Sequence, residues 1–106
     1  MRRQILKQIL IEKYIKPSEI FKLDYDDGFK IERWFDRYGD LHSFMGHPAE
    51  VVFCKFKLSE KRWFKKGILH SDGQFASIIE YQNKQKETHY WFKRGVLIKK
   101  ENFYNI

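Results

Sequence analysis

The chain has 106 residues, of which 42% are hydrophobic, 18% aromatic and 33% charged, and 21 Lys and Arg against 14 Asp and Glu give a net charge of +7. This length fits one domain, and the many aromatic side chains exclude disorder as the global state. No apolar run approaches the ~20 residues that cross a bilayer, and the N-terminus has no signal-peptide pattern. The single cysteine, Cys54, excludes an internal disulfide framework and suits the reducing cytoplasm, where we expect the protein to act.

Residues 2–16 carry the one helical pattern of the sequence. A mostly apolar stripe recurs near the 3.6-residue period, and it consists of Ile5, Leu6, Ile9, Leu10, Lys13 and Ile15. Pro17 ends the pattern, because the residue before a proline is pushed out of the helical region. We expect a helix within residues 1–17 that covers one face of a sheet. A helix that binds a partner or a membrane surface is the alternative.

After Pro17 the sequence predicts short strands separated by turns. Residues 21–25 alternate apolar and polar side chains, residues 26–28 carry the Asp-Gly signature of a hairpin turn, and residues 29–35 run back. Further strands are expected over 49–57, 74–82 and 87–92, with turns at 65–67, 71–73, 83–85 and 93–95. The expected fold is mainly β, of the α+β class: an antiparallel meander with one N-terminal helix.

Part of the sequence is repeated. Residues 33–42 match residues 62–70, and residues 90–98 form a third, truncated copy; the three tryptophans are 29 and 28 residues apart. Each copy carries a Trp-Phe pair that enters a glycine turn, where the glycine can adopt a positive φ. The structural repeat residues are Trp34, Gly39, His42, Trp63, Gly67, His70, Trp91 and Gly95. We expect a single domain over residues 1–106, in which hairpin repeats at 29–57, 58–86 and 87–100 share one sheet.

The repeat resembles a known class of sequences. Its pattern, Trp-aromatic-x-x-Gly-x-Leu-His-x-x-x-Gly-x-Pro-Ala, is similar to the tandem hairpin repeats of small phage and bacterial proteins, which are related in style to MORN repeats. The match is best at Trp34, Gly39, His42, Gly46, Pro48 and Ala49. The second copy has Phe75 at the proline position, and the third has Ile98 in place of the histidine. The resemblance implies a non-catalytic binding or scaffold role.

Candidate residues for metal binding or catalysis are few. His42 and His70 hold equivalent repeat positions and could project on one side of the sheet, where a zinc or transition-metal site would need His47, Cys54 or His89 as well. Their spacing matches no compact ligand motif. Cys54 lies in the apolar run 51–56, where we expect a buried cysteine that acts as a small hydrophobe. We therefore expect that the protein is not an enzyme and that it has no metal site and no cofactor.

The positive charge is concentrated in the C-terminal half. Residues 1–54 hold nine basic and nine acidic residues, whereas residues 55–106 hold twelve basic and five acidic residues. This asymmetry favours a basic face and an anionic partner, although lysines at strand edges also prevent aggregation. Repeats that stack in register would bring six cations to one basic rim: Lys61, Arg62, Lys65, Lys66, Lys93 and Arg94. The first copy has Asp36, Arg37 and Asp40 at the matching place.

Two classes of function stay open. The first, which we favour, is a small interaction protein, a phage-type inhibitor or modulator that binds an acidic surface of a host protein or protein–nucleic-acid complex through its basic C-terminal face. The second is a sequence-tolerant nucleic-acid binder, because rings beside cations can hold bases and phosphates. The first copy keeps its Trp-Phe pair although Asp36 follows it, so the tryptophans are interpreted as core. We expect no membrane partner.

This interpretation predicts that Trp34, Trp63 and Trp91 are largely buried in equivalent settings. Trp63→Ala should then lower the free energy of unfolding by roughly 3–5 kcal/mol, as large-to-small changes in cores do. Denaturation with urea measures the loss. Iodide that quenches all three tryptophans as freely as a model indole would contradict the prediction.

Overall fold

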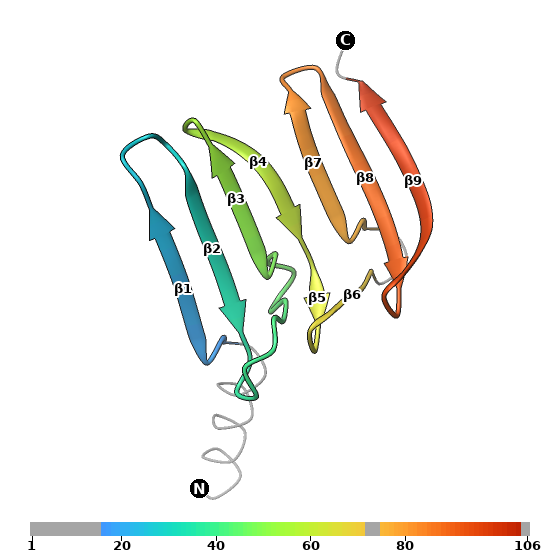
Figure 1. The fold of residues 1–106 in the computed structure, drawn as a ribbon. Coiled ribbons are helices and arrows are strands. Elements are labelled where there is room, and N and C mark those ends of the chain that lie inside the picture. The colour runs from blue at the N-terminus through green and yellow to red at the C-terminus, as the bar shows by residue number, and fades with distance from the viewer. Residues whose placement is uncertain (1–15, 72–74, 105–106) are drawn as a thin grey trace, which may run out of the picture.

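The computed structural model describes residues 16–71 and 75–104, which form antiparallel β-structure (Figure 1). The main sheet has seven strands in the order β1-β2-β3-β4-β7-β8-β9, and β5 and β6 form a separate two-stranded sheet. The strands are β1 (Glu19–Asp24), β2 (Lys30–Phe35), β3 (Glu50–Cys54), β4 (Lys57–Arg62), β5 (Phe64–Lys65), β6 (Ile68–Leu69), β7 (Ile78–Asn83), β8 (Lys86–Lys93) and β9 (Val96–Tyr104). The predicted antiparallel meander is confirmed, whereas the predicted N-terminal helix lies outside the described residues apart from its last positions.

Strand register gives the main sheet two different faces. Arg33 pairs with Glu50 and Glu50 with Arg62, so these side chains form a row across three strands. We call the side of the sheet with this row the ladder face. Because side chains alternate along a strand, Trp34 and Lys61 project from the opposite side, which we call the tryptophan face.

The three copies of the repeat form the same hairpin. In each copy the phenylalanine after the tryptophan pairs with the leucine after the turn, giving the pairs Phe35–Leu41, Phe64–Leu69 and Phe92–Leu97. The turn glycines Gly39, Gly67 and Gly95 have φ values of 83°, 79° and 80°, as the sequence predicted. The repeat in the sequence is therefore a repeat in the structure.

Backbone hydrogen bonds join each hairpin to the next. The turn glycine donates to the leucine carbonyl of the preceding copy, and the serine after each histidine donates to the phenylalanine carbonyl of the following copy. The bonds are Gly67 N to Leu41 O (2.8 Å), Gly95 N to Leu69 O (3.2 Å), Ser43 N to Phe64 O (2.8 Å) and Ser71 N to Phe92 O (3.1 Å). The hairpin tips consequently lie side by side at one end of the sheet, the lower end in Figure 1.

The third copy differs from the others after its hairpin. In the first two copies a loop lies between the leucine and the strand that returns to pair next to the tryptophan. Pairing resumes at Ala49 in the first copy, whose carbonyl accepts from Trp34 N (2.8 Å), and at Ser77 in the second copy, whose carbonyl accepts from Trp63 N (2.7 Å). In the third copy the single residue Ile98 takes the place of this loop, and the β8–β9 register shifts there. β9 thus continues as one strand to Tyr104, beyond the expected boundary at residue 100.

Two expectations about residues 49–57 are wrong. The expected single strand is divided into β3 and β4 by a turn, in which Lys55 and Phe56 have φ values of 50° and 66°. Cys54 ends β3 at this turn and is exposed rather than buried. The turn was missed because it contains no Gly, Asn or Asp, and the Phe56 amide is held from outside the hairpin by the Gly28 carbonyl at 3.0 Å.

Burial in the described residues is concentrated on small side chains and a few rings. Ala49 and Ser77 are fully buried beside the tryptophans to which they are bonded, and Phe44 is 2% exposed. Trp91 is buried, at 9% exposure, whereas Trp34 and Trp63 are half-buried. The prediction that all three tryptophans are largely buried in equivalent settings is therefore wrong for Trp34 and Trp63: the backbone positions are equivalent, but the surroundings of the rings differ because each copy packs against a different neighbour.

Gly28 allows the turn between β1 and β2 to contact the turn between β3 and β4. A Cβ at Gly28 would lie 2.5 Å from the Phe56 backbone nitrogen, whereas a Cβ at Gly39 would meet nothing within 4 Å. Both glycines have a left-handed φ, +88° and +83°. Gly39→Ala should therefore cost about 1–2 kcal/mol of unfolding free energy from backbone strain alone, and Gly28→Ala should cost distinctly more. Equal losses in urea denaturation would contradict a tight contact between the two turns.

Candidate functional site

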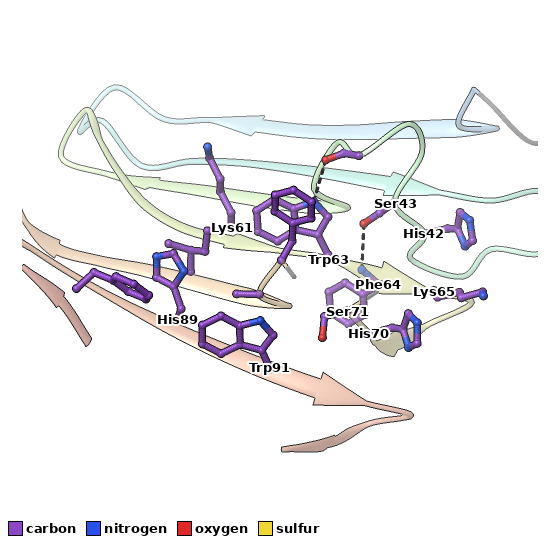
Figure 2. Close-up of a pocket in the computed structure, with 15 residues that line it drawn as sticks. His42, Ser43, Lys61, Trp63, Phe64, Lys65, His70, Ser71, His89 and Trp91 are labelled. Carbon is purple, nitrogen blue, oxygen red and sulfur yellow. Dashed lines mark hydrogen bonds between the residues drawn. The ribbon is translucent and has the colours of Figure 1, made fainter. Parts of the chain in front are cut away.

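A groove of about 810 Å³ lies on the tryptophan face, between the second and third copies (Figure 2). Pockets that bind small ligands typically measure ~300–1,000 Å³. Its main apolar lining consists of Trp63, Phe64, Phe75, Ile79, Trp91 and Phe103, and its polar lining of His42, Ser43, Lys61, Lys65, His70, Ser71 and His89. The described structure thus combines large rings with cations in one concave site.

The register of three strands builds the floor of the groove. Lys61 on β4 pairs with Ile79 on β7, and Ile79 pairs with His89 on β8, so the three side chains form one row. Trp63 and Trp91 follow two residues after Lys61 and His89 and return to the same face. The period of two therefore aligns the repeat tryptophans with this row.

The loop of the first copy forms a wall of the groove. The indole N–H of Trp63 donates to the Gly46 carbonyl at 2.9 Å, and the Phe64 amide donates to Ser43 Oγ at 3.0 Å (Figure 2). These bonds fix the Trp63 ring by its nitrogen edge while the ring stays half-buried. The groove is consequently held open by backbone and side-chain bonds between copies.

His42 and His70 both line the groove, on one side of the molecule as their repeat positions suggested. His42 Nδ1 accepts the Lys66 amide at 3.1 Å, and His89 Nε2 lies 2.9 Å from a carboxylate oxygen of Glu87. In the described residues, no group of three or more His, Cys, Asp or Glu side chains could hold a metal ion.

His47, which the sequence grouped with these histidines, does not line the groove. Its ring stacks on Trp34 with centroids 3.7 Å apart and an interplanar angle of 4°. Its Nδ1 lies 2.6 Å from the Pro48 carbonyl oxygen. His47 thus serves to cover Trp34.

The structure brings four of the six predicted rim cations together. Lys65 and Lys66 lie at the β5–β6 turn, and Lys93 and Arg94 lie at the neighbouring β8–β9 turn; all four are exposed. We call these four residues the basic turns. The Gly95–Leu69 bond holds the two turns side by side. The corresponding turn of the first copy carries Asp36, Arg37 and Asp40, so the row of turns goes from weakly acidic to basic along the repeat.

The other two rim cations lie elsewhere. Lys61 lies on the groove floor, and its Nζ is 5.8 Å from the centroid of the Tyr81 ring. Arg62 projects from the ladder face, where it forms ion pairs with Glu50 at 3.9 Å and with Glu60. The expected rim of six is therefore divided, because adjacent residues of a strand point to opposite faces.

Charges on the ladder face are largely paired. Arg33 Nε lies 2.8 Å from Glu50 Oε2, and Arg62 completes the row. A hydrogen bond with Glu80, followed by burial and the charges of Glu80 and Glu60, raises the pKa of Tyr90 above its ordinary value. The unpaired positive charge of the C-terminal half consequently lies at the two ends of the sheet: the basic turns at one end, and Lys55, Lys57 and Lys84 at the other.

Sequence reasoning did not single out Ser43, Ile79 or Phe103 as groove residues. Ser43 carried a signal, since a serine follows the histidine in both full copies, at positions 43 and 71. Ile79 and Phe103 carried none, because their place in the groove depends on strand pairing across the sheet. Local sequence patterns do not report which strands are neighbours.

Comparison of the chain with protein-family models, with curated proteins and with solved structures finds no match. Within residues 16–71 and 75–104, no helix is long and apolar enough to cross a membrane.

The Trp63 bond to the first-copy loop can be tested against a matched control. Trp63→Phe removes the N–H that donates to Gly46, which should cost about 1 kcal/mol for the lost hydrogen bond. Trp34 Nε1 is buried without a hydrogen-bond partner in the described structure, so Trp34→Phe makes the same change in size without breaking such a bond. Urea denaturation should show the larger loss for Trp63→Phe. An equal or smaller loss would contradict a role for this bond in holding the loop.

Proposed function

We propose that the protein is a non-catalytic binding module that takes an acidic, partly apolar segment of a partner protein into the groove. The observation that carries this proposal is the position of Lys65, which both lines the groove and belongs to the basic turns. An apolar site and an exposed cationic patch are therefore continuous. A segment with carboxylates next to large apolar side chains matches both.

Rings and cations would contribute differently to binding. Burial of apolar surface against Trp63 and Trp91 supplies affinity. Exposed ion pairs add only about 0.2–1 kcal/mol each, so the basic turns contribute mainly to the rate and orientation of association. This attraction is screened beyond ~10 Å at 0.1 M salt. The gradient from acidic to basic turns would orient the partner along the row of hairpins.

We predict that the protein inhibits or modulates a host complex in the cytoplasm, as phage-type inhibitors do. The resemblance of the repeats to MORN-like hairpins supports a scaffold role. Affinity capture from the native host, with and without nuclease, would identify the partner.

Binding of single-stranded nucleic acid is the second candidate. One observation favours it: the half-buried Trp63 ring lies in the same groove as Lys61 and Lys65. Stacking of a base on such a ring contributes about 1–3 kcal/mol, and lysines contact phosphates. Affinity would then fall steeply as salt rises, because bound phosphates release counterions.

Reversing the basic turns tests the proposed function. The variant Lys65→Glu, Lys66→Glu, Lys93→Glu, Arg94→Glu should slow association with a labelled peptide of alternating Glu and Phe by about tenfold or more at low ionic strength. The matched control reverses four exposed lysines near the opposite end of the sheet: Lys30, Lys55, Lys57 and Lys84. Stopped-flow fluorescence measures the rates, and thermal unfolding checks that both variants fold.

The outcomes separate the candidates. Slower association of the basic-turn variant alone supports the proposal, whereas unchanged association would show that these cations do not steer the partner. A labelled oligothymidine strand that binds tightly, with a steep salt dependence, while the peptide does not bind, would replace the proposal by nucleic-acid binding. Binding of neither probe would overturn both.

A further inference from the structure

β9 is a long strand with an open outer edge. It has nine residues, all of them exposed, and among the described strands it pairs with β8 alone. Its apolar residues include Val96 (64% exposed), Leu97 (48%) and Phe103 (41%). A long exposed edge with apolar side chains is a template for pairing with another strand.

Neighbouring hydrogen bonds show which backbone groups of β9 face outward. Phe92 and Tyr90 bond towards β7 and the loop before it: Phe92 N donates to Ser77 Oγ, and the Tyr90 carbonyl accepts from Ser77 N. Their partners in β9, Leu97 and Lys100, therefore direct their N–H and C=O groups to the open edge. Because the direction of the N–H and C=O groups alternates along a strand, those of Asn102 and Tyr104 also face the open edge. Leu97 and Lys100 are three residues apart rather than two because the register shifts at Ile98.

We propose that β9 pairs antiparallel with β9 of a second copy of this chain, about a two-fold axis at Lys100. In this register the outward-facing N–H and C=O groups of one copy face those of the other copy. Lys100 opposes Lys100, and Leu97 opposes Asn102. On the tryptophan face, Lys99 opposes Glu101 and Val96 opposes Phe103, and each pair occurs twice. The strand is self-complementary on this face, in charge and in apolar character.

β1, at the opposite edge of the sheet, is the alternative strand for self-pairing. It has six residues against nine in β9, and a two-fold axis at Leu23 would place Lys22 against Asp24 and Phe21 against Tyr25. The only like-charged pair in the β9 arrangement is Lys100 with Lys100. In the monomer Lys100 Nζ already lies 5.5 Å from the centroid of its own Tyr90 ring, drawn back over the ladder face. Both edges therefore have a self-complementary register, and β9 is favoured because its nine exposed residues form a longer pairing edge than the six of β1.

Such a dimer would present both tryptophan faces on the same side, because an axis normal to the sheet does not exchange its faces. Each Phe103 lines a groove and would also contact Val96 of the second copy. The two grooves could then engage a partner with two acidic segments. Dimerisation itself does not depend on what the grooves bind.

A charge exchange across the interface tests the proposal by sedimentation over a range of concentrations. Wild-type protein should dimerise, and Lys99→Glu or Glu101→Lys alone should weaken dimerisation about tenfold or more, since each places like charges opposite one another twice. An equimolar mixture of the two single variants should form heterodimers, because opposite charges then meet at both sites. The double variant Lys99→Glu, Glu101→Lys should dimerise like the wild type.

The control separates the interface from the monomer. Lys99 and Glu101 also form an ion pair within their own strand at 3.1 Å, so loss of this pair alone would change thermal stability without selecting heterodimers. A wild-type protein that stays monomeric at every concentration would overturn the proposal, as would a dimer that ignores these substitutions. Dimerisation without heterodimer selection would assign the contact to another surface.

A cross-link tests the register. In a Cys54→Ser background, Lys100→Cys should form a disulfide between copies when oxidised glutathione is added as the oxidant, because Cα atoms of a bonded antiparallel pair lie about 5.5 Å apart, within the reach of a disulfide. Glu101→Cys is the control, since the two-fold axis places its two copies on opposite sides of the centre. Cross-linking of Glu101→Cys in preference to Lys100→Cys would contradict the proposed axis.

Discussion

The backbone bond from the turn glycine of one hairpin to the leucine carbonyl of the preceding hairpin sets the spacing of the whole molecule. It recurs at Gly67–Leu41 and Gly95–Leu69. A hairpin with a single Trp-Phe pair is too small to bury its own rings, and isolated two-stranded hairpins are marginally stable in water. Stacking the copies brings the first-copy loop to the Trp63 ring. Because the bond between hairpins joins backbone groups, it tolerates the different turn residues of the copies.

The groove follows from the same spacing. Trp63 and Trp91 belong to consecutive copies, and the first-copy loop reaches the second through Ser43 and Gly46. The structure makes Ala49 equivalent to Ser77, so Phe75 corresponds to His47 and not to the proline position that the sequence predicted; it is 78% exposed. His47 stacks closely on Trp34, so the site next to the first tryptophan is covered, whereas the site between the second and third stays open. A departure from the repeat pattern thus coincides with the groove.

Strand alternation then distributes the charge. Lys61 and Arg62 are adjacent in sequence, yet Lys61 lies in the groove and Arg62 lies in a row of ion pairs on the other face. The turns are free of this constraint, so four cations of the second and third copies gather at one end of the sheet. Exposed lysines also lie at the other end, so what distinguishes the basic turns is their continuity with the groove through Lys65.

The sequence by itself determined the β class, the three-fold repeat and the glycine turns, because alternation, repeat spacing and the need for a positive φ are local properties. The tertiary structure alone decided that Lys55 and Phe56 form a turn, that Cys54 is exposed, that Arg62 leaves the basic rim and that Phe103 joins the groove. Each of these depends on which strands are neighbours and in what register. That choice is made by hydrogen bonds between residues far apart in the chain, such as Phe56 with Gly28, which no local pattern encodes.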